Sequence, residues 1–502
     1  MKYLSIHRGT LLASALVAVF LTTGCDGFLT ETNKSSITQD NYYKTPEQAE
    51  SAINGLYPTL RFFTSSAGYG ENQWVSLELL VGHAMTNGQS DRNRQFIAHT
   101  AGSEHPAFRD FWNNLYYGIS NANVAIANIP KIDMDEARKN RLLGQAYFLR
   151  AFYYYHLVRL YGDVPLITEP VNASSPELYP DRDPAEAVYD LIVSDLKTAE
   201  QSGLPNTDAS GRVSLGAVKS LLASVYLTMA GHPLNKGEEY YRLAAEKAEE
   251  VIDSGWYTLF DDYAYLHDRA HKNQGEFIFQ VQYQAGISTH AITQLITPEN
   301  EGITPFGDEY GSLRPINEFV ASYENGDKRT EEQQFYFSKY ELEDGTVKEF
   351  GEWALYKYWL DEAAGHNGDQ QDDQNWTLLR LPEVMLIYAE ASNEVSGPTQ
   401  KAYDQINAIR ERANLDPLSG LTKEQFREAV WRERYHELAY ENKAYFDIQR
   451  TRKAYDLENN RFVDVVGFTN AQGTTWTEKY LLWAIPDSER QTNPNLTQNP
   501  QW

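Results

Sequence analysis

Amphipathic helical segments recur along most of this chain and constrain its fold more than any other feature. Within each segment, apolar residues are spaced three or four positions apart, as they are on one face of an α-helix. Short links join successive segments, so the pattern predicts a mainly α fold built from helix pairs. The predicted helices are Thr45–Phe63, Phe108–Asn128, Met134–Tyr161, Asp183–Gln201, Ser214–Met229, Gly237–Ser254, Leu381–Val395, Thr399–Ala413 and Thr422–Tyr455.

Glycine motifs inside these segments favour helix-turn-helix repeats of the tetratricopeptide type. Leu143-Gly144-Gln145-Ala146-Tyr147 fits the Leu-Gly-x-x-Tyr part of such a repeat, and Leu215-Gly216 fits half of it. A glycine allows two helices to approach closely while larger residues fill the neighbouring grooves. Asp133 and Ser214 are the expected N-caps of two of these helices.

A loop-rich region at 256–376 separates the early helix pairs from the late ones. Its strand-like stretches, 276–281 and 353–359, lie between Gly- and Asp-rich loops. We therefore expect an insertion with short β-strands on a rigid helical frame, an arrangement in which loops commonly bind ligands. The predicted divisions are a signal peptide at 1–24, a lipidated tether at 25–44, helical regions at 45–255 and 377–502, and the insertion at 256–376.

Cys25, the only cysteine, ends an N-terminal export signal. Lys2 and Arg8 are followed by an apolar run at 11–21, which is about half the length of a membrane-spanning helix. Small residues then lead to Gly24-Cys25, as in a bacterial lipobox, so we predict cleavage before Cys25 and lipidation of its thiol. The alternative is an ordinary secretory signal with a chance cysteine.

The charge and the apolar runs restrict what the mature chain can bind. The formal net charge is −26, which argues against nucleic acid and against docking on anionic lipid, because both need a basic surface. No later stretch approaches 18 consecutive apolar residues, so we expect a soluble body held to the membrane by its lipid alone. Without a second cysteine, the chain forms no internal disulfide and no thiolate metal site.

Motifs typical of catalytic and metal sites are incomplete or missing in this sequence. His436-Glu437 begins like a zinc-protease helix, but Tyr440 stands where the second ligand is needed. Neither a G-x-S-x-G elbow nor a phosphate-binding G-x-x-x-x-G-K-[ST] run occurs. The acidic loop Asp361–Asp373 could bind calcium, but it departs from the EF-hand pattern and is read as a solvated loop. We predict no catalytic residues, no metal site and no cofactor.

Further motifs follow one another along the chain at Cys25–Thr30, Leu149–Leu166, Leu379–Ala391, Ile406–Arg410, Glu433–Glu441, Trp483–Pro486 and Asn493–Pro500. In this order they resemble the SusD/RagB family of outer-membrane nutrient-binding lipoproteins. The resemblance covers nearly the whole mature chain, and the C-terminal pieces are the most specific. One departure is 442–448, which lacks the Arg that the family more often has shortly before Phe446-Asp447, so a local salt bridge is in question.

The resemblance implies a fold, a location and a function. The fold would contain about four tetratricopeptide-like helix pairs. The protein would face the cell exterior from the outer membrane, cover a SusC-like TonB-dependent transporter and deliver glycan to it without catalysis. A peptide-capture subunit of the same kind of import complex is the alternative.

Sugar recognition needs flat aromatic faces for C–H patches, and amides, carboxylates or Arg for hydroxyl groups. Two regions outside the helical frame offer this mixture: 69–96, which family members often use for binding, and the insertion. We predict that aromatic residues from both form a stacking platform, with polar side chains beside it. The candidate ligand-binding residues are Trp74, Asn87, Asp91, Arg92, Tyr283, Phe306 and Tyr310.

Overall fold

The computed structural model describes residues 42–64, 73–86, 90–172, 175, 178–304, 309–361 and 372–502. Helices dominate this part of the chain, as the sequence predicts. Their bounds are α2 Pro46–Asn54, α3 Gln73–Leu79, α4 Asp91–Ile97, α5 Pro106–Asn128, α6 Glu136–Tyr161, α7 Ala185–Glu200, α8 Leu215–Ala230, α9 Glu238–Asp253, α10 Ile292–Ile296, α11 Asn317–Ala321, α13 Leu381–Ser396, α14 Gln400–Arg412, α15 Lys423–Glu437, α16 Ala444–Thr451 and α17 Asp487–Thr492, with 3₁₀ turns that include η2 Tyr57–Thr64 and η8 Glu478–Leu481.

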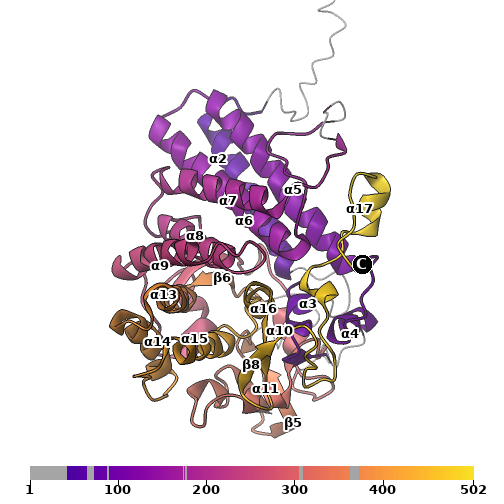
Figure 1. Ribbon diagram of the computed structural model, residues 1–502, viewed down its shortest axis with the longest axis vertical. Coiled ribbons are helices and arrows are strands. Elements are labelled where there is room, and N and C mark those ends of the chain that lie inside the picture. Colours follow the sequence, from indigo (N-terminus) through magenta and orange to yellow (C-terminus); the bar gives the residue numbers. More distant parts are fainter. Residues whose placement is uncertain are drawn as a thin grey trace, which may run out of the picture.

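The long helices form a stacked array in which neighbours along the chain pack against each other. Contacts join α5 to α6, α6 to α7, α7 to α8 and α8 to α9, and then α13 to α9, α14 and α15. In Figure 1 the array descends from α5, α6 and α7 in the upper part to α13, α14 and α15 at lower left. The insertion elements α10, α11 and β5 lie at lower right, beside the late helices rather than between the early ones. The late helices thus lie next to the insertion, while the early helices extend away from it.

Close helix contact explains two of the glycines. Gly118 of α5 faces the buried ring of Tyr153 on α6, and a Cβ at position 118 would lie only 2.5 Å from that ring. Gly144 of the Leu-Gly-x-x-Tyr motif packs in the same way against Ser202, just after α7. The helix starts differ in one detail from the prediction, because Asp135 rather than Asp133 caps α6, accepting from the Arg138 amide at 2.8 Å.

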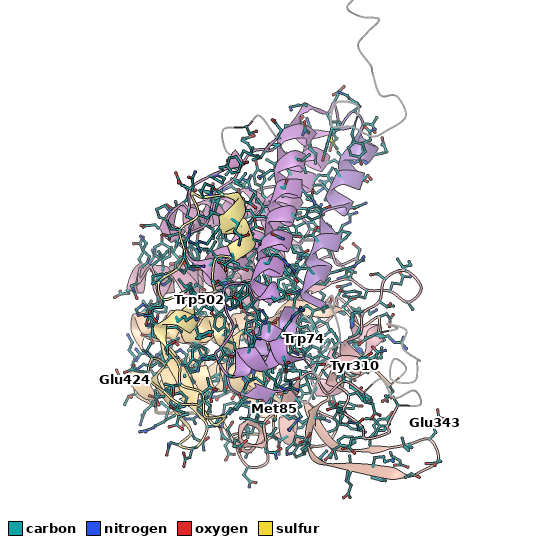
Figure 2. All side chains as sticks on the ribbon, turned by 90° about the vertical axis from the view of Figure 1, so that its right-hand side faces the viewer. Trp74, Met85, Tyr310, Glu343, Glu424 and Trp502 are labelled. Atoms are coloured by element: carbon teal, nitrogen blue, oxygen red, sulfur yellow. The ribbon has the colours of Figure 1, made fainter. Side chains whose placement is uncertain are left out.

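Short antiparallel pairs make up the β-structure of the described residues. The pairs are β1–β3, β2–β6, β4–β5 and β7–β8, and Figure 2 shows the β4–β5 hairpin, with Glu343, projecting from the end of the molecule away from α5. The pair β2–β6 closes the insertion, since Phe277 lies opposite Arg380 and Val281 opposite Trp376. The strand bounds are β1 Ala84–Met85, β2 Phe277–Val281, β3 Arg314–Pro315, β4 Tyr336–Glu341, β5 Val347–Leu355, β6 Trp376–Arg380, β7 Lys453–Asp456 and β8 Arg461–Asp464.

Two predicted helices are shorter in the structure than the sequence pattern indicates. Thr45–Phe63 divides into α2 and η2 at Gly55. Thr422–Tyr455 ends as a helix at Glu437 and restarts as α16. Between these helices Tyr440 and Asn442 have φ values of 64° and 57°, the left-handed region that interrupts a helix.

A buried ion-pair network surrounds this interruption and joins the insertion to the helical frame. Glu437 accepts from Arg380 and Arg412 at 2.5 Å each and from Arg329 at 3.2 Å. Burial favours the neutral acid, but Arg412 and Arg380 outweigh it and hold the pKa of Glu437 well below its usual range. Lys357 and Arg380 both bind Glu441, so the tertiary ion pairs stabilise a break that helix periodicity does not reveal.

None of the helices in the described ranges is both long and apolar enough to cross a membrane.

Candidate functional site

Three predicted site residues, Cys25, Asn87 and Phe306, lie outside the described residues. Most of the acidic loop Asp361–Asp373 lies outside them as well. Within the part of the chain that the structure describes, no group of three His, Cys, Asp or Glu side chains is arranged to hold a metal ion.

Trp74 is a core residue in this structure. Its side chain is 0% exposed, and its ring lies 4.9 Å from that of Trp376 and 5.7 Å from that of Tyr358, centroid to centroid. These partners come from the insertion and its closing strand, so Trp74 on α3, labelled in Figure 2, packs the two regions together. Neither ring face is open to a ligand in this conformation.

Asp91 and Arg92 lie on α4, away from this aromatic cluster. Asp91 is exposed and pairs with Arg94 of the same helix at 2.5 Å. Arg92 is also exposed, and its carbonyl accepts a hydrogen bond from His105 at 3.3 Å. Their helix contacts α3, so both side chains are accessible, on a helix separate from the one that holds Trp74.

Tyr283 joins the insertion to η2, which precedes the first region in which the sequence predicts ligand contacts. Its hydroxyl shares a hydrogen bond with Thr64 at the end of η2, and the guanidinium carbon of Arg61 lies 5.6 Å from the centre of its ring. Tyr283 is buried, which raises its pKa to about 12. Tyr310 is half-buried, and its amide donates to the carbonyl of Gln294 at 3.2 Å.

A polar cleft opens beside Tyr283 and is called here the amide cleft. Its volume is about 180 Å³. The side chain of Gln282 exchanges two hydrogen bonds with Asn273, at 2.8 and 2.9 Å, and accepts from Asn375 at 2.9 Å. The cleft therefore presents amides and guanidinium groups with fixed orientations. Its lining residues are Asn54, Tyr57, Leu60, Arg61, Ser210, Gly211, Arg212, Gln280, Val281 and Gln282.

Charged groups next to the amide cleft fix the turn that follows Tyr283. Asp373 accepts from Arg269 at 3.1 Å and from Lys272 at 3.3 Å, and also receives the Ala285 amide. Burial favours the neutral acid, but these two cations lower the pKa of Asp373. At the tip of the turn, Ile287 is 75% exposed. An exposed apolar side chain therefore lies at the tip of a turn that ion pairs and a backbone hydrogen bond hold in place.

A second surface, called here the tyrosine groove, has a volume of about 420 Å³ and lies between α5, the segment that follows α6, and α17. Seven large apolar or aromatic side chains are exposed in the described part of the chain, and four of them gather here. Tyr117 and Tyr179 are 62% and 51% exposed. The sequence analysis did not predict this groove. The available signal was Tyr117, an aromatic residue that lies outside the apolar stripe of α5. The four exposed residues are Tyr117, Val171, Leu178 and Tyr179.

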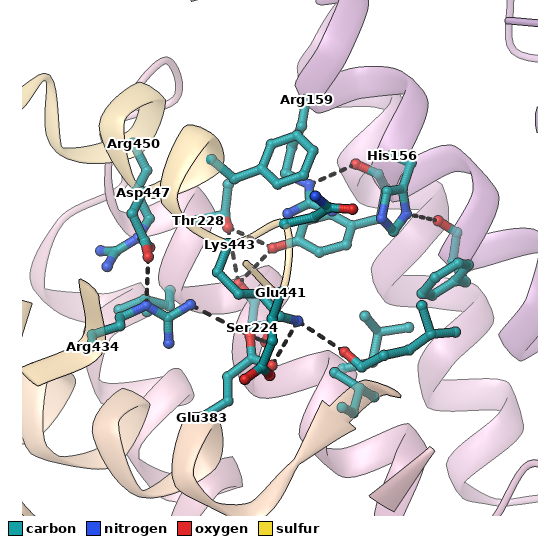
Figure 3. A pocket seen from close by; sticks show the side chains of 18 of the residues that line it. His156, Arg159, Ser224, Thr228, Glu383, Arg434, Glu441, Lys443, Asp447 and Arg450 are labelled. Carbon is teal, nitrogen blue, oxygen red and sulfur yellow. Dashed lines mark hydrogen bonds and ion pairs between the residues drawn. The ribbon is translucent and has the colours of Figure 1, made fainter. Parts of the chain in front are cut away.

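A small charged cavity lies deeper, between α6, α8, α13 and α16 (Figure 3). Its acids are already neutralised: Glu383 pairs with Lys443 at 2.7 Å, and Asp447 pairs with Arg434 at 2.7 Å. Burial holds the pKa of His156 well below its ordinary value. The cavity measures about 50 Å³, which is too small for a sugar ring, and its paired acids are arranged as supporting ion pairs.

Comparison with known proteins gives matches at both ends of the chain. Residues 28–227 match a family described as "Starch-binding associating with outer membrane", and residues 349–502 match the SusD family. A solved SusD superfamily protein from Parabacteroides distasonis is 38% identical, with a TM-score of 0.87 over 93% of this chain and 100% of that one. The chain belongs to the SusD/RagB family.

Further relatives share this SusD architecture along most of its length. SusD-like protein P2 of Formosa agariphila is 29% identical over 96% of this chain and 98% of its own. A solved laminarin-binding SusD-like protein is 25% identical, with a TM-score of 0.76 over 92% of this chain and 100% of that one. The expected family and its mainly α fold are thereby confirmed.

The structure also resolves the departure from the SusD pattern at 442–448. Lys443 donates to Glu383, while Asp447 binds Arg434 and Arg450, at 2.7 and 2.8 Å. The local salt bridges are therefore present in this SusD-family chain. Their cations come from Lys443 and from arginines placed before and after the Phe446-Asp447 pair.

Proposed function

We propose that this protein is an outer-membrane lipoprotein of the cell surface that captures a glycan and delivers it to a SusC-like TonB-dependent transporter. The observation that carries the proposal is the likeness to the laminarin-binding SusD-like protein over 92% of the chain. The protein would bind its glycan without cleaving it. The acids that line the small charged cavity, Glu383, Glu441 and Asp447, are held in ion pairs, which suits a binding role.

The amide cleft and the Tyr283 turn are the proposed place of glycan contact. Sugar hydroxyls accept hydrogen bonds from guanidinium groups, and the cleft has two of these at its wall. The amides of Gln280 and Gln282 are hydrogen-bonded within the protein and fix the shape of the cleft. Arg61 and Arg212 are both half-buried at its wall, and Arg61 donates to the Gln282 carbonyl at 3.4 Å. A carbohydrate would therefore meet preoriented donors there. Ligand contact by Asn87, Asp91, Arg92, Phe306 and Tyr310 stays a prediction.

The membrane anchor and the transporter belong to the same proposal. Cys25 would carry the lipid, as its lipobox-like context predicts. Exposed apolar patches mark protein contact sites, and the tyrosine groove is such a patch. We propose it as the surface to test first for the transporter. Replacing Tyr117 and Tyr179 together with serine should reduce recovery of the transporter with this protein, while Cys25→Ala should release the protein from the membrane fraction.

Affinity gel electrophoresis of the soluble form, Asp26–Trp502, against a polysaccharide panel that includes laminarin tests the glycan proposal. We expect retardation by one class of polymer, and a weaker effect in Arg61→Ala and Arg212→Ala. Arg242→Ala is the matched control, because Arg242 is an exposed arginine of α9 that pairs with Glu246. Equal retardation of the cleft variants and the wild type would exclude the amide cleft as the site. If no polymer retards the protein, a peptide panel tests the alternative of peptide capture.

A further inference from the structure

A basic pocket of about 520 Å³ opens at the C-terminal ends of α6 and α8, separate from the amide cleft. Residues of α7, α16, η8 and the C-terminal segment also line its wall. Positive side chains outnumber negative ones in this wall, although the whole chain has a net charge of −26. The charged lining residues are Arg159, Arg182, Arg450, Arg452 and Lys479, with the acids Asp163 and Glu478.

Two of these cations are neutralised within the protein. Arg450 binds both oxygens of Glu390, at 2.5 and 2.8 Å. Arg452 pairs with Glu478. The positive excess of the pocket therefore comes from the other three cations.

Arg159 is held against aromatic rings rather than against an acid. Its guanidinium carbon lies 3.6 Å from the ring centres of both Tyr155 and Phe446, and its Nε donates to the Tyr155 carbonyl at 3.0 Å. Among the described residues no carboxylate lies within 4 Å of this guanidinium, and its two Nη groups have no hydrogen-bond acceptor there. Burial is the largest influence on Arg159 and lowers its pKa, although Glu383 and Asp447 act in the opposite direction without forming an ion pair with it.

Arg182 and Lys479 contribute positive charge to the pocket, and neither forms an ion pair with a carboxylate of the described residues. Arg182 donates to neutral oxygens, including the Asp163 carbonyl at 2.7 Å and the Asn499 side chain at 2.5 Å. The ammonium of Lys479 lies 4.1 Å from the ring centre of Trp502. Each of these contacts positions a cation, and in the described part of the chain none of them neutralises it.

We propose that this pocket binds the oxyanion of an acidic saccharide, either a uronate carboxylate or a sulfate ester. A partly buried guanidinium that makes no direct ion pair is unfavourable, and a bound oxyanion would reduce that cost. The free Nη groups of Arg159 form the fork that matches two oxygens of one carboxylate or sulfate, and Lys479 provides a point charge. The volume lies within the usual range for small-molecule sites, so a sugar ring can enter with the anion.

Isothermal titration of the mature lipidated chain in detergent tests the proposal with two probes, sodium sulfate and sodium glucuronate. Sodium chloride keeps the ionic strength constant. We expect one probe to bind, and Lys479→Ala to weaken its affinity about tenfold, because a charge-assisted hydrogen bond contributes about 1.5–3 kcal/mol. Arg159→Lys keeps the positive charge but removes the fork, and should weaken the same probe at least as much.

Lys131→Ala is the control, since it removes the same charge from an exposed position at the end of α5. Binding of glucuronate assigns the pocket to uronates, and binding of sulfate assigns it to sulfate esters. The proposal is overturned if neither probe binds at millimolar concentration, or if Lys131→Ala weakens binding as much as Lys479→Ala does. It is also overturned if Lys479→Ala and Arg159→Lys both bind the probe with wild-type affinity.

Discussion

Replacing Trp74 with alanine distinguishes a core role from a ligand-stacking role. A fully buried Trp changed to Ala removes a large apolar side chain and leaves a cavity, which costs about 3–5 kcal/mol of stability. The contacts with Trp376 and Tyr358 belong to that loss. The loss of the indole nitrogen adds little to this stability cost, because it has no hydrogen-bond partner among the described residues. We therefore expect the free energy of unfolding to fall by about 4 kcal/mol, a large part of the roughly 5–15 kcal/mol typical of a domain.

Urea unfolding followed by circular dichroism measures this loss without relying on the tryptophan that is removed. Trp256→Ala is the control, because Trp256 is only half-buried and should cost much less. Polysaccharide retardation of the remaining folded Trp74→Ala protein should stay close to wild type. The reasoning is refuted if Trp74→Ala unfolds at the wild-type urea concentration and loses retardation, since Trp74 would then contact the ligand directly.

Three further predictions concern the stability of the frame. Glu437→Gln should lower the unfolding free energy in urea by about 3–5 kcal/mol, because three buried arginines lose their shared carboxylate. Gly118→Ala should lower it by about 1–3 kcal/mol through the clash with Tyr153, although alanine is the better helix former. Burial lowers the pKa of His267 to about 4, so the unfolded chain protonates this residue first and stability falls as the pH drops from about 6.5 to 4. In urea titrations between pH 6.5 and 5, His267→Gln should reduce that slope by up to about 1.4 kcal/mol per pH unit.

Each of these variants has its own check. Lys401→Ala removes exposed ion pairs with Glu249 and Asp253 and should cost less than about 1 kcal/mol. A similar cost for Glu437→Gln would show that the buried network contributes no more than a surface pair. Stabilisation by Gly118→Ala would mean that α5 and α6 can separate without loss. An unchanged pH slope in His267→Gln would mean that His267 titrates as it does in the unfolded chain.

Helix periodicity identified most of the frame because the long helices bury one continuous apolar face. The predicted segments 381–395 and 399–413 differ from α13 and α14 by a residue or two at their ends. The same periodicity failed at 438–443, where the break depends on arginines from distant parts of the chain. An amphipathic pattern reports local burial, and it contains no information about partners more than 50 residues away, such as Arg380.

The sequence by itself determined the helical frame and the family, because these depend on local patterns and on ordered motifs. Only the tertiary structure decided how single aromatic and charged residues are used. Trp74 and Tyr117 are both aromatic residues of helices, yet one is fully buried and the other is 62% exposed. Arg159 follows a run of buried residues within α6 and lines a pocket in which it makes no ion pair. Exposure and charge pairing arise from packing between segments far apart in the chain, so no local pattern contains them.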